Sequence, residues 1–153
     1  MKQMAKVEDI AEYILSKTGN ITAMKLEKLV YYSQAWSLVF DDEPLFAEKI
    51  EAWANGPVVR KLYRKHAGNY LVSSVGGNIS ALKESAKKRI DSVLKVYADK
   101  TAQWLSDLTH SERPWQTARK NIPDGENSRN EITLESMKEF YTELFLQSRG
   151  QKA

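Results

Sequence analysis

The sequence predicts a mainly α-helical, single-domain fold built as a compact bundle around one buried central helix, and three observations support this. Residues 22–40, TAMKLEKLVYYSQAWSLVF, place apolar side chains on most of the circumference of a helix. Most other apolar residues also recur at helical spacing, between short polar breaks. The 153 residues show no change of composition that would mark a second domain. A helix as apolar as 22–40 must be covered by neighbours on more than one side.

The boundaries of the first two helices are indicated by their flanking residues. Apolar spacing over residues 7–15 predicts a helix, and Gly19 follows where a left-handed residue commonly ends one. Thr22 is expected to cap the central helix. The acidic run 41–43 and Pro44 should end it, because negative charge is unfavourable at a helix C-terminus and proline disfavours helical geometry in the preceding residue.

The middle of the chain allows two interpretations. Residues 45–53 fit a helix or a short strand, and the glycine-rich residues 70–79 fit a loop or a hairpin. If both are extended, they could pair and add a minor two-stranded β element (about 45–53 with 70–79). Between them, Asn55-Gly56-Pro57 predicts a turn into a helix that has Pro57 at its first position, where the missing N–H costs nothing.

The C-terminal half predicts further helices and one long loop. Helical spacing recurs over residues 82–97, 101–108, 111–119 and 134–145. Residues 121–130, NIPDGENSRN, have the composition of a loop, and Thr133 is expected to cap the last helix. We therefore expect one domain over residues 1–153, with an ordered body over about 5–147 and a frayed tail over 148–153.

Composition excludes several classes of function. The chain has no cysteine, which excludes disulfides, thiolate catalysis and cysteine zinc sites. No apolar run approaches the about 20 residues that span a bilayer, and the N-terminus lacks the apolar stretch of a signal peptide, so we expect a cytoplasmic protein that does not contact a membrane. A net charge of +3 is too small by itself to indicate nucleic-acid binding.

No catalytic, cofactor or metal site is predicted. Phosphate-binding loops, dinucleotide-binding loops, nucleophile elbows and histidine pairs at metal-ligand spacing are all absent from the sequence. A hydrolase hypothesis would need His110, with Glu112 or Thr109 as its acid–base partner. A lone histidine beside a turn such as Pro114 is more often a structural residue at a helix end. We therefore predict that the protein is not an enzyme and uses no cofactor.

The tryptophans and the basic residues are the other candidates for binding. Trp36 and Trp104 lie on apolar stripes and are expected in the core, whereas Trp53 and Trp115 lie beside turns that they could pin from inside. The basic residues form two groups, Arg60, Lys61, Arg64 and Lys65 with His66, and Lys87, Lys88 and Arg89. Nearby acidic residues dilute both groups, so solvated helix faces are favoured over a nucleic-acid site.

Three segments carry a recognisable pattern in a fixed order. They are MKLEKLVYYSQAW (24–36) followed by Pro44-Leu45-Phe46, then EAWANGPVVRKLY (51–63), then LSDLTHSERPWQTAR (105–119). Together they resemble the Panacea domain, a family of SocA-like and GepA-like phage-associated antitoxins, over about residues 7–145. The motif residues that the resemblance implies, and that we expect to be structural, are Trp36, Trp53, Gly56, Pro57, Thr109, His110, Pro114 and Trp115.

The resemblance implies binding rather than catalysis. Family members neutralise a toxin encoded by a neighbouring gene, usually by direct protein contact, so the expected partner is a cognate toxin and the expected source a bacterium or prophage. SocA-like members are also linked to delivering a toxin to a bacterial protease, which leaves a proteolytic adaptor as one alternative. A nucleic-acid-binding regulator is another. Some members carry an additional specificity segment, for which this chain has almost no room.

The toxin-binding surface is therefore expected on the domain itself or on its short ends. Interfaces favour aromatic side chains, and loops next to rigid elements often carry binding residues. These criteria select the exposed part of residues 57–66 and the loop 70–79. The candidates for partner contact are Tyr31, Arg60, Lys61, Tyr63, Arg64 and Tyr70.

Overall fold

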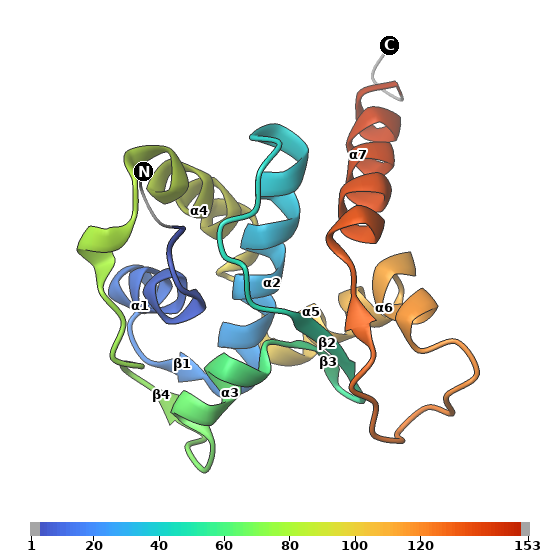
Figure 1. The fold of residues 1–153 in the computed structure, drawn as a ribbon, viewed down its shortest axis with the longest axis horizontal. Coiled ribbons are helices and arrows are strands. Elements are labelled where there is room, and N and C mark those ends of the chain that lie inside the picture. Colours follow the sequence, from blue (N-terminus) through green and yellow to red (C-terminus); the bar gives the residue numbers. More distant parts are fainter. Residues whose placement is uncertain (1–3, 151–153) are drawn as a thin grey trace.

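The computed structural model describes residues 4–150 and confirms a mainly α-helical fold around a central helix (Figure 1). Its α-helices are α1 (Val7–Thr18), α2 (Ala23–Phe40), α3 (Arg60–His66), α4 (Glu84–Tyr97), α5 (Ala102–His110), α6 (Arg113–Ala118) and α7 (Leu134–Gly150), with a short 3-10 helix η1 (Ile79–Ala81) before α4. None of the helices among the described residues is long and apolar enough to cross a membrane.

Helix α2 contacts most of the other helices. Helices α1 and α4 pack on one side of it and α7 on the other, while α5 crosses near its first turns (Figure 1). Leu26, Leu29 and Tyr32 are completely buried, and the predicted cap is present, since Oγ1 of Thr22 accepts from the N–H of Lys25 at 3.1 Å. Cover on several sides explains why so little of this helix is polar.

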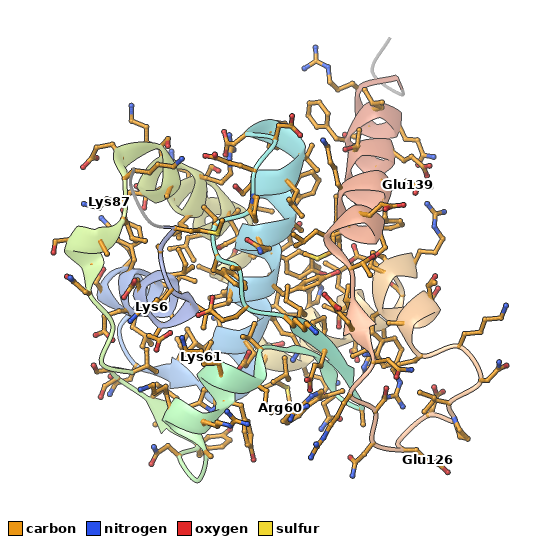
Figure 2. The ribbon with its side chains drawn as sticks, viewed as in Figure 1. Lys6, Arg60, Lys61, Lys87, Glu126 and Glu139 are labelled. Carbon is orange, nitrogen blue, oxygen red and sulfur yellow. The ribbon has the colours of Figure 1, made fainter. Side chains whose placement is uncertain are left out.

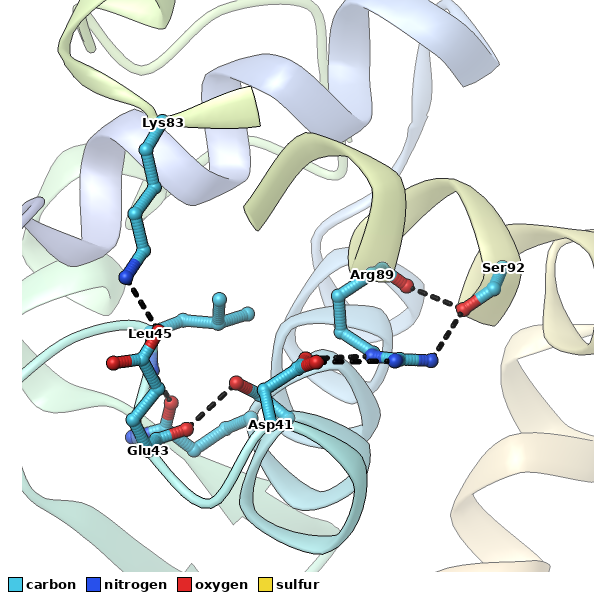
Figure 3. Close-up of polar contacts among 8 residues, drawn as sticks. Asp41, Glu43, Leu45, Lys83, Arg89 and Ser92 are labelled. Carbon is cyan, nitrogen blue, oxygen red and sulfur yellow. Dashed lines mark hydrogen bonds and ion pairs between the residues drawn. The ribbon is translucent and has the colours of Figure 1, made fainter. Parts of the chain in front are cut away.

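The connection that follows α2 is fastened to α4 by charged side chains (Figure 3). The guanidinium of Arg89 donates to both carboxylate oxygens of Asp41, at 2.7 and 3.2 Å. Lys83, the residue just before α4, pairs with Glu43. The acidic run that ends the central helix therefore also positions α4 against it.

The extended segments exist, but they pair differently from the prediction. Strand β2 (Ile50–Trp53) lies between β3 (Gly56–Val58) and β5 (Glu131–Ile132) in a three-stranded antiparallel sheet. Strand β4 (Leu71–Val72) pairs instead with β1 (Ile21–Thr22). The predicted pairing of 45–53 with 70–79 is therefore wrong. A two-residue turn lets β2 pair with the segment next to it, and closing so short a loop costs little chain entropy.

The helix predicted to start at Pro57 begins at Arg60 instead. Pro57 lies in β3 opposite Ala52, at an edge of the sheet, where the missing N–H of proline is tolerated. The N–H of Val59, just before α3, donates to Oε1 of Glu27 at 3.0 Å. A carboxylate from α2 thus satisfies one of the free donors at the start of this helix.

Three smaller expectations also change. Trp104, expected in the core, is 44% exposed on α5. Helix α7 continues to Gly150, so residues 148–150 are helical, and the rest of the tail expected to fray, 151–153, lies outside the described residues. The cap of the last helix follows the prediction, since Oγ1 of Thr133 accepts from the N–H of Ser136 at the start of α7. The helix expected over 111–119 begins at Arg113 instead, with Pro114 in its first turn, and Ser111 ends α5.

Candidate partner-binding site

Side chains from the predicted motifs converge on the β2–β3 hairpin. Four of its backbone carbonyls accept hydrogen bonds from side chains of α2, α5 and the α6 segment: Ala52 from Nη1 of Arg119 (3.0 Å), Trp53 from Nε1 of Trp115 (2.8 Å), Asn55 from Oγ of Ser106 (2.8 Å) and Pro57 from Nζ of Lys28 (3.3 Å). Buried backbone acceptors need such partners. The motif residues therefore hold the hairpin in one position.

Lys28 is the most unusual of these donors. It is 1% exposed, and burial lowers the pKa of its ammonium group to about 8. It crosses beneath Gly56, whose φ of +122° is in the left-handed region. This suggests how Gly56 and Pro57 act structurally: Gly56 leaves room for the Lys28 side chain, and the carbonyl of Pro57 accepts a hydrogen bond from its Nζ.

A buried pair joins α3 to α2. Nε2 of His66 lies 2.7 Å from Oε2 of Glu27, and both residues are 3% exposed. The other carboxylate oxygen of Glu27 is the acceptor for the amide before α3. Removing either partner would leave a buried polar group without its bond, so this pair fixes the position of α3 relative to the hairpin.

His110 does not form the acid–base unit that a hydrolase would need. Its ring packs against that of Trp115 at a tilt of 41°, with centroids 4.1 Å apart. Burial lowers the pKa of His110, although a backbone hydrogen bond with Ala54 opposes the shift. Neither expected partner is bonded to it: Oγ1 of Thr109 donates to a carbonyl of its own helix, and Glu112 accepts from tyrosines. The arrangement supports a structural role for His110.

Tyr31, expected to contact the partner, belongs to the core. It is 2% exposed, and its hydroxyl lies 3.0 Å from that of Tyr141. Tyr141 and Tyr32 both donate to Oε1 of Glu112 at 2.7 Å, so Tyr31 is the donor to Tyr141. Burial raises the pKa of Glu112, against the effect of these hydrogen bonds. The prediction that Tyr31 contacts the partner is therefore wrong, because its side chain is buried and its hydroxyl is hydrogen-bonded in the core.

A pocket of about 250 Å³ lies between the hairpin, α3 and the first turn of α2. Trp53 and Tyr63 form part of its wall, with ring centroids 4.9 Å apart, and Tyr63 is 39% exposed. Met24, Asn55 and the buried Glu27–His66 pair also line it. Most ligand pockets have volumes of about 300–1,000 Å³, so this one suits a single side chain better than a cofactor.

The other candidates do not line this pocket. Arg60 lies beside the sheet and donates to Glu51 at 2.7 Å (Figure 2). Lys61 pairs with Glu8 of α1 at 3.6 Å and with Glu48, in the connection before β2, at 3.1 Å. Arg64 is exposed on α3, and Tyr70 follows the helix with 80% of its surface exposed. We call Trp53, Tyr63, Arg64 and Tyr70, with the pocket, the hairpin–α3 surface.

No group of three or more potential ligand side chains in residues 4–150 is arranged to hold a metal ion. A family model for the SocA-like antitoxin Panacea domain matches residues 26–116, which is more than half of the chain. The chain belongs to this Panacea family. The matched residues include α2, the hairpin, α3 and α5, so they contain most of the contacts described above, while α7 lies beyond them. No curated protein and no solved structure matches the chain.

Sequence reasoning missed how this Panacea domain uses its buried polar residues. Glu27, Lys28 and Arg119 were not among the candidates, because charged residues on helices are usually solvated. Their position in the sequence could have indicated that they are buried. Glu27 and Lys28 lie inside the most apolar stretch of the chain, where a charged residue must find a partner in the interior.

Proposed function

We propose that this Panacea protein is an antitoxin that neutralises a cognate toxin by binding it directly through the hairpin–α3 surface. The observation that supports this most is a side-chain-sized pocket beside the firmly held hairpin, with Trp53 and the partly exposed Tyr63 in its wall. Tyr70, on the loop after α3, adds a second exposed aromatic side chain. Tyrosine and tryptophan dominate the energetics of protein interfaces, and anchors set in pockets contribute most. A surface already fixed before binding loses less entropy when the partner arrives.

The basic residues also favour a protein partner over a nucleic acid. Arg60, Lys61 and Arg89, which a nucleic-acid site would use, each pair with a carboxylate of the chain itself. Phosphate contacts would need these charges free. Arg64 and Lys65 remain exposed on α3, beside the aromatic residues. We expect them to face acidic groups of the toxin.

Family members are generally non-enzymatic, and we propose the same of this protein, without a cofactor and in the bacterial cytoplasm. Occlusion of the toxin requires only the surface described here. The proteolytic adaptor remains the alternative outcome of the same binding event, and the two differ in what happens to the toxin.

Co-expression with the neighbouring reading frame tests the proposal. The neighbour alone should stop growth, and this protein should restore growth and co-purify with the neighbour's product. Toxin levels should stay constant when the antitoxin is induced, whereas an adaptor would lower them in a protease-dependent way. Absence of both rescue and a complex would contradict the proposal.

A further inference from the structure

A second hollow lies away from the hairpin, between the end of α2, α4 and α7. It has a volume of about 270 Å³ and is lined by Trp36, Phe40, Arg89, Ser92, Val93, Val96, Tyr97 and Phe145, which we call the α2–α4–α7 groove. Phe40 is 44% and Val96 58% exposed. Phe40 ends the apolar stretch 22–40, so part of that stretch serves this groove rather than the core.

The walls of the groove are held in place by specific contacts. The ring of Phe40 stacks on Trp36 (centroids 5.6 Å apart) and meets the edge of Phe145 at 4.8 Å. The guanidinium of Arg89 lies 4.7 Å from the centre of the Phe40 ring, and Asp41 fixes it there (Figure 3). Nε1 of Trp36 donates to Tyr97 at 3.0 Å. The groove therefore exists before any partner binds.

Positive charge surrounds this apolar groove. Lys88 and Lys95 are exposed on α4, four residues before and three after the lining residue Ser92, so they lie along its rim. On α7, the guanidinium of Arg149 lies 5.7 Å from the Phe145 ring. None of these three cations forms an ion pair with another residue in the described part of the chain, whereas Arg89, which lines the groove, is neutralised by Asp41.

One wall of the groove lies outside the family match. Helix α7 follows residue 116, the last residue matched, whereas α4 and all but the first three residues of α2 lie within the match. Phe145 and Arg149 therefore lie beyond the matched residues.

We propose that the α2–α4–α7 groove binds an acidic amphipathic helix of a partner protein. An apolar side chain of that helix would enter between Phe40, Val96 and Phe145, and its carboxylates would face Lys88, Lys95 and Arg149. A helix with an apolar face enters a hydrophobic groove in this manner, and complementary charge selects it over a basic one. The proposal does not depend on the function assigned to the hairpin–α3 surface.

A pair of matched peptides tests this proposal on the full chain. The probe is a fluorescently labelled, terminally blocked helix of about 14 residues with leucines at i, i+3, i+4 and i+7 and glutamates elsewhere, and its match has lysines in place of the glutamates. The acidic peptide should bind at least about tenfold more tightly, and salt should weaken its binding. Val96→Glu should lower this affinity by about tenfold or more, and Leu71→Glu, equally exposed on another surface, should not.

Three outcomes would overturn the proposal. They are no binding of the acidic peptide at about 1 mM, equal binding of both peptides, and unchanged binding to Val96→Glu. A double variant, Lys88→Glu with Lys95→Glu, leaves the apolar walls intact and should favour the basic peptide. Self-association of the wild-type protein that Val96→Glu abolishes would show a second copy in the groove and would also contradict the proposal.

Discussion

The side chain of Lys28 occupies the space that a Cβ atom on Gly56 would need. Such an atom would lie 2.4 Å from Cε and 3.1 Å from Nζ of Lys28, although the two residues are far apart in the sequence. This contact joins the first and second motif segments, because α2 carries the lysine and the hairpin carries the glycine. A lysine can only cross here beneath a residue that has no side chain.

Gly56→Ala should be strongly destabilising. The alanine would suffer both a left-handed φ of +122° and the clash with Lys28, so we expect a loss of about 3 kcal/mol in the free energy of unfolding. Gly125→Ala is the matched control, because its φ is +85° but nothing lies within 4 Å of its Cβ, and it should cost about 1 kcal/mol. Equal losses in urea unfolding of the two variants would show that the clash does not matter.

Buried Lys28 should make stability rise with pH. Its folded pKa of about 8 is below the ordinary value of 10.5, so between these values the unfolded chain holds more protons and raising the pH favours folding. From pH 8 to about 9.5, wild type should gain up to about 2 kcal/mol relative to Lys28→Met, and the comparison cancels the ionisation of the tyrosines that both proteins share. Urea unfolding at several pH values measures this, and parallel pH profiles would contradict it.

Glu112 should be replaceable by glutamine but not by alanine. Glu112→Gln keeps an acceptor for the hydroxyls of Tyr32 and Tyr141, so its stability should stay within about 1 kcal/mol of wild type. Glu112→Ala strands two buried donors and should cost about 3 kcal/mol. Because burial raises the carboxyl pKa, its ionisation opposes folding as pH rises through that pKa, and glutamine should remove this slope. Similar losses in both variants would exclude the network as a source of stability.

Glu12 should make the loop 74–78 sensitive to acid. Its Oε1 accepts from the N–H of Val75 (2.9 Å) and of Gly77 (3.2 Å); burial raises its pKa, but these bonds and one from Ser74 outweigh burial and lower it overall. The stabilisation is therefore present above the ordinary value of 4.5 and is lost as pH falls through the lower folded pKa.

Hydrogen exchange at Val75 and Gly77 should accordingly be faster in Glu12→Gln than in wild type at pH 7. The melting temperatures of the two proteins should converge as the solution is acidified. Glu139→Gln is the control, because Glu139 lies exposed on α7 (Figure 2). A constant difference in melting temperature down to pH 3 would count against this role of Glu12.

Tyr63→Ala and Tyr70→Ala should each weaken toxin neutralisation without unfolding the protein. Tyr70 is 80% exposed, so Tyr70→Ala should alter stability by no more than about 0.5 kcal/mol and the melting temperature by about 2 °C. The ring of Tyr63 packs against Trp53, so Tyr63→Ala should cost about 1 kcal/mol, which is too little to unfold the protein. Loss of an aromatic anchor should weaken toxin binding by at least about tenfold. Leu134→Ala, of similar exposure at the start of α7, should leave binding intact. If both tyrosine variants still rescued growth as well as wild type, the hairpin–α3 surface would not be the toxin-binding site.

Helix positions were predictable because they depend on local signals. The apolar stretch 22–40, the cap at Thr22 and the glycine at 19 each act within a turn or two of their own helix. Strand pairing was not predictable, because nothing in residues 45–53 or 70–79 indicates which segment each of them pairs with. β2 found β3 across a two-residue turn and β5 from far along the chain.

The exposure of some candidate residues was predictable, but the arrangement around them was not. The motif segments contain the hairpin without revealing its pairing, and Tyr63 and Tyr70 are exposed as expected. Tyr31 was misplaced because its neighbours along the helix do not reveal Tyr141, which is 110 residues away and provides its hydrogen-bond partner. Long-range partners of buried polar groups decide which tyrosine faces solvent, and helical spacing alone does not contain them.

The most direct measurement is hydrogen exchange of this protein alone and in complex with the toxin encoded by its neighbouring gene. The account predicts that binding slows amide exchange across residues 53–71, which include the hairpin turn, α3 and the loop that carries Tyr70. A stable complex in which those amides exchange as fast as in the free protein would contradict the central claim.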